Sequence, residues 1–287
     1  MATVLKYFSL IKFSHTVFAL PFALIGYFIA VFHSQTTINW VVFIYVLLCM
    51  VFARSAAMAF NRYIDREIDK KNNRTAQVRE IPNGTIKPAS ALVFVIINAS
   101  LFIATTFFIN PICFYLSPIA LIVILGYSYT KRFTALCHLI LGIGLALAPI
   151  GAYLAVVGKF NLLPLLFSFA VLFWVSGFDI IYSLQDEEFD KEQKLNSIPV
   201  LLGKNNALIL SSILHLFTIF FIVAAGFYGN FHTFYWIGAF VFISLLIYQH
   251  ILVKPTDLSR VNVAFFTTNG VASVIFSAFV LLDLYFF

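Results

Sequence analysis

The sequence predicts an all-α membrane protein with nine transmembrane helices. Hydrophobic residues make up 62% of the 287-residue chain and charged residues only 10%, whereas a soluble domain carries roughly a quarter charged residues. The apolar residues form continuous runs of about 20 residues, the length at which a helix spans a bilayer. Acidic residues are rare, and most of them gather in two short motifs at the ends of two apolar runs. The composition therefore predicts a helical bundle, and the motifs indicate where its function resides.

Short polar turns separate most of the predicted helices, and two longer polar segments follow the acidic motifs. These longer segments are residues 66–88 and 185–206. We expect them to form cytoplasmic caps over one end of a single polytopic domain that covers residues 1–287. The predicted helices are, in chain order, residues 14–33, 39–64, 89–109, 112–130, 134–157, 162–184, 207–228, 232–252 and 262–285.

The basic residues predict the orientation of the chain. Of the 18 Lys and Arg residues, only Lys159 lies in a loop on the side away from the acidic motifs, and Arg54 lies inside a helix. Because basic residues accumulate in cytoplasmic loops, we expect the motifs to face the cytoplasm, with the N-terminus inside and the C-terminus outside. The formal charge of +6 has the same explanation and does not indicate a nucleic-acid partner. The three cysteines have neither metal-binding nor disulfide-framework spacing.

Each acidic motif begins where an apolar run gives way to a polar segment. In a continuous helix, Asn61, Asp65 and Asp69 would lie near one face, because they are four residues apart. The acids of the second motif would likewise form a narrow stripe. They are Asp179, Asp186 and Asp190.

Two stripes of carboxylates at the same membrane depth fit a site for hard divalent cations. Mg²⁺ prefers oxygen ligands and usually takes one or two carboxylates together with substrate phosphates. A metal-bound diphosphate is therefore the ligand that the motifs predict. The alternative is that acidic helix ends at a membrane surface are simply solvated, and a single Asp-x-x-x-Asp motif would favour it. Two such motifs on one side of the membrane favour the metal site.

Arg54 is a further candidate, because it lies inside a predicted membrane helix. It precedes Asn61 by two helical turns and would share the face of the first motif. An ionised side chain at that depth costs about 3 kcal/mol or more and usually marks a functional site. The alternative is a structural ion pair with an acidic residue of another helix, for which Asp179 is the best candidate.

Lys131 and Arg132 close the fourth predicted helix on the same side of the membrane. They could bind phosphate or carboxylate oxygens, with Arg as a bidentate donor. They could equally serve only to orient the chain, and their spacing does not decide between these roles. Lys12, Ser14 and His15 open the first predicted helix at the same level, where a histidine is more typical of a membrane interface than of a catalyst.

The pattern Asn61-x-x-x-Asp65-x-x-x-Asp69, together with the second motif, resembles the two signatures of the UbiA superfamily of intramembrane prenyltransferases. The resemblance spans the whole chain, because nine helices with motifs after the second and sixth are the plan of that family. The chain is most similar to the 4-hydroxybenzoate polyprenyltransferase branch. Within it, residues 14–21 and 185–190 resemble bacterial members associated with futalosine-route menaquinone synthesis. The segments that carry the resemblance are residues 18–23, 61–65, 182–190 and 197–199.

The resemblance implies a bundle around a central cavity, in a bacterial inner membrane, that opens to the cytoplasm. It also implies an Mg²⁺-dependent enzyme of ubiquinone or menaquinone biosynthesis. The enzyme would transfer a polyprenyl group from a polyprenyl diphosphate to an aromatic acid, either 4-hydroxybenzoate or a related hydroxy-naphthoate. Two Mg²⁺ ions would hold the diphosphate. The implied metal ligands are Asn61, Asp65, Asp69, Asp186 and Asp190.

The resemblance also implies roles for the remaining candidates. Lys131 and Arg132 would neutralise the departing diphosphate, which stabilises charge that develops in the transition state. Asp179 and Tyr182 would contact substrate. Arg54 or Arg132 would pair with the carboxylate of the acceptor, and the sequence does not choose between them.

Two other classes of membrane protein remain as alternatives. A transporter also places charges inside the membrane, but here the acids gather at one rim rather than near the midplane. A CDP-alcohol phosphotransferase is another Asp-rich Mg²⁺ enzyme of membranes. Its motif needs Asp-Gly pairs, and neither Asp65 nor Asp186 is followed by glycine. A purely structural scaffold would not need two aligned carboxylate stripes.

Overall fold

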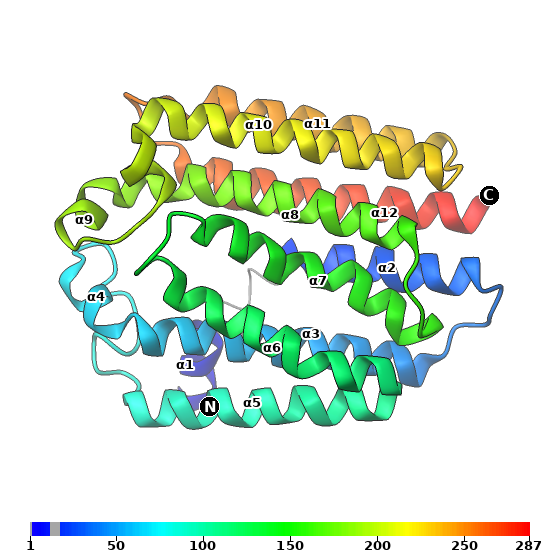
Figure 1. Ribbon diagram of the computed structural model, residues 1–287, viewed down its shortest axis with the longest axis horizontal. Helices are drawn as coiled ribbons and strands as arrows, with labels where there is room; N and C mark the ends of the chain where they lie inside the picture. Colours follow the sequence, from blue (N-terminus) through cyan, green and yellow to red (C-terminus); the bar gives the residue numbers. More distant parts are fainter. Residues whose placement is uncertain (1, 12–17) are drawn as a thin grey trace.

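Long helices lie side by side in the computed structural model, which describes residues 2–11 and 18–287. The described elements are α1 (Ala2–Leu10), α2 (Leu20–His33), α3 (Trp40–Ile64), α4 (Arg66–Lys71), α5 (Pro88–Ile109), α6 (Pro111–Thr130), α7 (Cys137–Val157), α8 (Leu162–Ser183), the 3₁₀ turn η2 (Leu184–Asp186), α9 (Glu187–Glu192), α10 (Ile198–Tyr228), α11 (Thr233–Leu252), the π-helix η3 (Val263–Thr268) and α12 (Asn269–Phe286). The short helices α4 and α9 lie together at one end of the bundle (Figure 1).

The expectation of an all-helical membrane protein is confirmed. Eight of the described helices are long and apolar enough to cross a membrane. The apolar α2 has only 14 residues, about 21 Å, which is less than the thickness of a hydrocarbon core. Of the first predicted helix, residues 14–33, the structure shows α2 over residues 20–33, and the number of nine spans stays a prediction. Lys12, Ser14 and His15 lie outside the described residues.

Asparagine side chains start several of the long helices. The Asn39 side chain accepts hydrogen bonds from the backbone N–H groups of Val41 at 3.1 Å and Val42 at 3.2 Å. Asn110 caps α6 and Asn161 caps α8 in the same manner. Such caps satisfy N–H groups that have no partner in the first helical turn. They explain why these helices begin within a residue or so of the predicted positions.

The two acidic motifs do not continue as single helices, so the prediction of two unbroken helical stripes was wrong. α3 ends just before Asp65, whose φ and ψ are −88° and 3°, and α4 starts just after it. In the second motif, η2 separates α8 from α9. Each break turns the chain across the end of the bundle. Asp69 and Asp190 consequently lie on the short helices α4 and α9, which face each other there.

The seventh predicted helix, residues 207–228, begins earlier than expected. α10 starts at Ile198, where the Ser197 side chain accepts a hydrogen bond from the Val200 N–H at 3.4 Å. Gly203 interrupts the helix with φ of 74° and ψ of 165°, a conformation that favours glycine. The segment predicted as a second loop, residues 185–206, is thus mostly helical. The Ser197 side chain starts α10 early, and Gly203 lets the chain change direction without leaving the helix for a long loop.

Helix α8 carries the second motif and is held by close packing on α7. A Cβ atom on Gly142 would lie only 2.5 Å from the backbone oxygen of Leu172. The two backbones therefore approach more closely than a larger residue would allow. The fully buried Trp174 anchors α8 in the hydrophobic core. His138, one turn before Gly142, is brought against α8, where the Ser176 hydroxyl donates to its backbone oxygen at 3.2 Å.

Candidate active site

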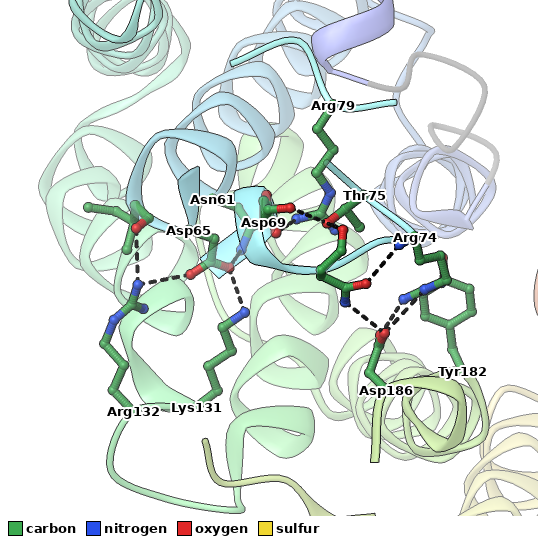
Figure 2. A network of polar contacts seen from close by, with 12 residues as sticks. Asn61, Asp65, Asp69, Arg74, Thr75, Arg79, Lys131, Arg132, Tyr182 and Asp186 are labelled. Atoms are coloured by element: carbon green, nitrogen blue, oxygen red, sulfur yellow. Dashed lines mark hydrogen bonds and ion pairs between the residues drawn. The ribbon is translucent and has the colours of Figure 1, made fainter. Parts of the chain in front are cut away.

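Asp65 lies where α3 ends, surrounded by basic and amide groups. Lys131 Nζ lies 2.8 Å from Asp65 Oδ2, and Arg132 Nη2 lies 3.0 Å from Oδ1. Asn61 donates from Nδ2 to Oδ2 of the same carboxylate at 3.1 Å. Asp65 is only 1% exposed, and a buried carboxylate needs such partners to stay ionised. The first motif and the end of α6 therefore form one polar cluster (Figure 2).

Asp69 is a second buried carboxylate and lies on α4. Arg79 forms an ion pair with its Oδ1 atom, and Thr75 Oγ1 donates to its backbone oxygen at 2.8 Å. The other carboxylate oxygen, Oδ2, is buried and has no hydrogen-bond partner within the part of the chain that the structure describes. An unpaired buried acceptor is unfavourable, and a bound cation is one way to satisfy it.

Asp186, at the end of η2, is held mainly by Arg74. The Arg74 guanidinium binds both carboxylate oxygens, with Nε 3.2 Å from Oδ1. Asn72 donates to the same Oδ1 atom at 3.2 Å. Arg74 also donates to the Tyr182 hydroxyl at 3.0 Å and lies over its ring. Burial alone would lower the pKa of Arg74, but the charge of Asp186 and the contact with Tyr182 raise it above its usual value. Arg74 therefore stays cationic.

A cavity of about 50 Å³ lies between the two motifs. Carboxylates from both motifs line it, and so do three basic side chains of the cap and of α6. It is large enough for an ion or one or two waters. The charged residues that line it are Asp69, Arg74, Arg79, Lys131, Asp186 and Asp190.

The donor set of this small cavity fits Mg²⁺. Asp69, Asp186 and Asp190 offer carboxylate oxygens from facing elements, and Asp69 Oδ2 still lacks a described partner. Among the described residues, no three His, Cys, Asp or Glu side chains converge closely enough to form a complete metal cage. An incomplete set suits Mg²⁺, because this ion normally keeps waters and completes its octahedron with substrate phosphates.

A second, much larger cavity of about 480 Å³ lies inside the bundle between α3, α5, α6, α7 and α8. Its walls are mostly apolar, with residues such as Phe102, Ile124 and Leu145. Arg54 and Asp179 also line it. A further lining residue, Tyr127, precedes Lys131 of the small cavity by one turn of α6. The polar part of the large cavity therefore lies next to the acidic site.

Asp179 has a partner that the sequence did not suggest. Its Oδ2 atom lies 2.7 Å from Nδ1 of His138, a residue that is 3% exposed. The sequence had singled out Asp179 as a partner for Arg54. Both residues do line the large cavity, but the described hydrogen bond of Asp179 is to His138.

The structure brings all the predicted site residues to one end of the bundle and divides them into two groups. Arg54 and Asp179 line the large cavity. The other predicted residues form the polar network at the mouth and its small cavity. They are Asn61, Asp65, Asp69, Lys131, Arg132, Tyr182, Asp186 and Asp190.

Sequence reasoning missed four residues of the site: Asn72, Arg74, Arg79 and His138. Arg74 and Arg79 are two of the 18 Lys and Arg residues that predict the orientation of the chain. The sequence feature that could have identified them is a cluster of cations directly after a motif rich in carboxylates. The signal for His138 was a titratable side chain at the start of a membrane helix, which is a costly position and therefore an informative one.

The fold and the site together define a membrane-embedded enzyme for an amphipathic anion. An apolar cavity inside the bundle suits a lipid chain, and the carboxylates and cations beside it suit a metal-bound phosphate group. Residues 19–271 match the sequence model of the UbiA prenyltransferase family. The chain therefore belongs to the UbiA prenyltransferase family and is an intramembrane prenyltransferase. This membership rules out the transporter and CDP-alcohol phosphotransferase alternatives.

Individual relatives agree with this assignment. The chain is 30% identical over 234 residues to the 4-hydroxybenzoate octaprenyltransferase of Pasteurella multocida, which covers 81% of this chain and 80% of the relative. The enzyme of the same name from Vibrio parahaemolyticus is also 30% identical and covers 84% of both chains.

Solved structures share the fold. The apo UbiA homolog from Aeropyrum pernix K1 superimposes with a TM-score of 0.84 at 29% identity, over 94% of this chain and 98% of that one. The UbiA homolog from Archaeoglobus fulgidus bound to DMAPP and Mg²⁺ has a TM-score of 0.76 at 20% identity, over 98% and 100% of the two chains.

The meeting of the two motifs can be tested without an activity assay. Asn72 Nδ2 and Asp186 Oδ1 lie 3.2 Å apart, so cysteines at these positions should be joined by a short bifunctional thiol reagent. The variant Asn72→Cys/Asp186→Cys is prepared with Cys49, Cys113 and Cys137 changed to Ser. After proteolytic cleavage between the two positions, the fragments are expected to stay linked on a denaturing gel.

The matched control is Lys159→Cys/Asp186→Cys in the same background. Helix α8 separates these positions by about 30 Å, so no linkage is expected. A linked control, or an unlinked 72/186 pair, would contradict the described arrangement of the motifs.

Proposed function

We propose that the protein transfers a polyprenyl group from a polyprenyl diphosphate to an aromatic acid in ubiquinone or menaquinone biosynthesis. The acceptor is 4-hydroxybenzoate or a related hydroxy-naphthoate. One observation carries the proposal: two carboxylate motifs with their basic partners adjoin a deep apolar cavity of about 480 Å³. The names of the relatives and the ligands of the Archaeoglobus fulgidus homolog support the same reaction.

The mouth of the cavity is proposed as the diphosphate site. Two Mg²⁺ ions, when bound, would neutralise the diphosphate and thereby favour ionisation of the allylic C–O bond. The residues that would hold them are Asn61, Asp65, Asp69, Asp186 and Asp190. The cations that now contact these acids, among them Lys131 and Arg74, lie within reach of the phosphate oxygens. They would stabilise the negative charge on the departing diphosphate.

The large cavity is proposed to hold the isoprenoid chain and the aromatic ring. Its apolar walls keep water away from an allylic cation, which would otherwise be hydrolysed. Tyr127 and the phenylalanines of the wall present aromatic faces that can stabilise such a cation. The cation then attacks an aromatic carbon beside the phenolic hydroxyl, and loss of a proton restores aromaticity.

Arg54 is the proposed partner of the acceptor carboxylate. It lines the large cavity, where the ring must lie to meet the allylic carbon. Arg132 is committed elsewhere: it donates to Ser128 O at 2.9 Å, to Ile64 O at 3.0 Å and to the Asp65 carboxylate. Between the two arginines that the sequence left open, the geometry favours Arg54.

We further propose a single domain with nine membrane spans, in a bacterial inner membrane, with both motifs and both caps on the cytoplasmic side. The positive-inside distribution supports this orientation, because Lys159 lies at the opposite end from Lys131 and Lys254. Two single-cysteine variants in the cysteine-free background test it. An impermeant maleimide should label Lys159→Cys in intact spheroplasts, and Asp257→Cys only after permeabilisation. The reverse pattern would contradict the orientation.

Removal of a carboxylate from either motif should abolish Mg²⁺-dependent transfer. We expect Asp65→Ala and Asp186→Ala each to lower the rate of prenyl transfer by about 10²-fold or more, because the charge on the diphosphate is then incompletely neutralised. The measurement uses purified protein, one polyprenyl diphosphate and a panel of aromatic acids, with product mass as the readout.

The control for this prediction is Glu188→Ala. Glu188 lies in the second motif but is exposed, so its loss should leave the rate near that of the unaltered protein. Substantial transfer by Asp65→Ala or Asp186→Ala in normally inserted protein would refute the metal assignment.

Arg54→Ala should act on the acceptor rather than on the donor. Loss of a charged hydrogen bond costs about 1.5–3 kcal/mol, so we expect the KM for the aromatic acid to rise about 10- to 100-fold while the KM for the diphosphate changes little. Arg132→Ala provides the comparison, because it should lower kcat instead. If Arg132→Ala rather than Arg54→Ala raises the acceptor KM, the assignment of the two arginines is reversed.

A further inference from the structure

The polar part of the large cavity contains a hydrogen-bonded pair that the proposed metal and diphosphate sites do not use. Asp179 lines the cavity from α8, and its Oδ2 atom lies 2.7 Å from His138 Nδ1 on α7. The Asp179 side chain keeps 22% of its surface exposed, whereas the His138 side chain keeps only 4%. The carboxylate is thus accessible from the cavity, and the imidazole lies behind it.

The backbone behind His138 determines its tautomer. The Ile198 N–H group, at the start of α10, points at His138 Nε2 at 3.3 Å. A backbone N–H can only donate, so Nε2 accepts and carries no proton. The remaining proton of a neutral imidazole is then on Nδ1, which donates to Asp179. His138 is itself held by the backbone, so its hydrogen bond fixes the orientation of the Asp179 carboxylate.

Asp179 also differs from the other acids of the site. Asp65, Asp69 and Asp186 each form an ion pair with an Arg or Lys side chain. The described partner of Asp179 is a neutral imidazole. Among the described residues that line the large cavity, Asp179 is also the one carboxylate. A proton released by a ring inside this cavity has no comparable acceptor among those described lining residues.

We propose that Asp179 is the base that removes the ring proton of the acceptor, and that His138 is the residue that positions it. This inference rests on the proposed function. In the reaction, the allylic C–O bond breaks and its electron pair leaves with the diphosphate. The ring carbon forms the new C–C bond with the allylic carbon. Asp179 then takes the proton from that ring carbon, through the oxygen that His138 does not bind, and the C–H electron pair restores the aromatic system. The protonated Asp179 returns its proton to water when the product leaves.

The arrangement also separates two roles that conflict. Ionisation of the diphosphate needs positive charge at the mouth, whereas proton removal needs a carboxylate that positive charge has not neutralised. Asp179 lies one turn inside the end of α8 at Ser183, and thus deeper than the arginines of the cap. α8 therefore supplies a base inside the cavity, and η2, which follows it directly, supplies an acid of the proposed metal site.

A deuterium isotope effect distinguishes a base from a merely structural residue. The substrate is 4-hydroxybenzoate with deuterium at the two ring positions beside the hydroxyl, compared with the unlabelled acid. In the unaltered enzyme we expect ionisation to limit the rate and the isotope effect to be near unity. In Asp179→Asn, kcat should fall on the order of 10²-fold or more, and a primary isotope effect should appear because proton removal has become limiting.

Variants of His138 test the positioning role. His138→Leu removes the hydrogen bond to Asp179, and a misplaced base should lower kcat by up to about 10²-fold with a measurable isotope effect. His138→Gln can still donate a side-chain N–H to Asp179 and should recover most of the rate. The matched control is His250→Gln, because His250 is also partly buried but bonds to His215, away from the cavity. It should leave the isotope effect at unity even if it lowers stability.

Spectroscopy provides a test that needs no acceptor. In protein with ¹⁵N-labelled histidine, the His138 signal, assigned by its loss in His138→Gln, should report a neutral ring protonated at Nδ1. An imidazolium, or a proton on Nε2, would overturn the positioning role of His138.

The outcomes separate this inference from the proposed function. If the unaltered enzyme prenylates no aromatic acid in the panel, the proposed function fails and the inference fails with it. If the enzyme prenylates 4-hydroxybenzoate while Asp179→Asn keeps its rate without an isotope effect, only the inference fails. A slow Asp179→Asn with no isotope effect also overturns the inference, because Asp179 then acts on binding or folding rather than on proton removal.

Discussion

Buried carboxylates at one end of the bundle constrain the rest of the structure. Asp65 and Asp69 are 1% and 3% exposed, and a carboxylate taken out of water is strongly destabilising unless other groups replace its hydration. Lys131 and Arg132 do this for Asp65, and Arg79 does it for Asp69. The same ion pairs join the end of α6 and the first cap to the end of α3. The ion pairs that compensate the buried carboxylates therefore also hold the helix ends and the first cap together at this end of the bundle.

These ion pairs are of a kind that a metal-bound diphosphate can replace. On the proposed function, Asp69 and Asp186 would hold divalent cations when these are bound, and Arg79 and Arg74, which now pair with these carboxylates, would pair with phosphate oxygens. Both sets of charges keep a partner of opposite sign throughout, so no buried charge is left uncompensated. The unpaired oxygen of Asp69 in the described structure marks the position where this compensation is still incomplete.

The sequence predicted the parts of this architecture that depend on local composition. The apolar runs predicted most helix positions, and the rare acids identified the site. The predicted helix 39–64 ends where α3 ends. The short helices α4 and α9 and the interruption at Gly203 could not be predicted, because they depend on how the chain crosses the end of the bundle. The partners of the acids were missed for the same reason. Arg74 lies in a polar segment where a positive charge is expected from the positive-inside rule alone. Only the folded first cap brings it to the second motif.

The different depths of Asp179 in α8 and Asp186 in η2 connect the two halves of the proposed chemistry. A carboxylate surrounded by cations binds metal well but accepts protons poorly, since positive neighbours stabilise its ionised form. A carboxylate that an imidazole holds through one oxygen has its other oxygen left to receive a proton from a substrate. Asp186 in η2 and Asp179 in α8 meet these two requirements, with Arg74 at the first and His138 at the second. The close approach of α7 at Gly142 makes the second environment possible, because it brings the imidazole to the face of α8 that looks into the cavity.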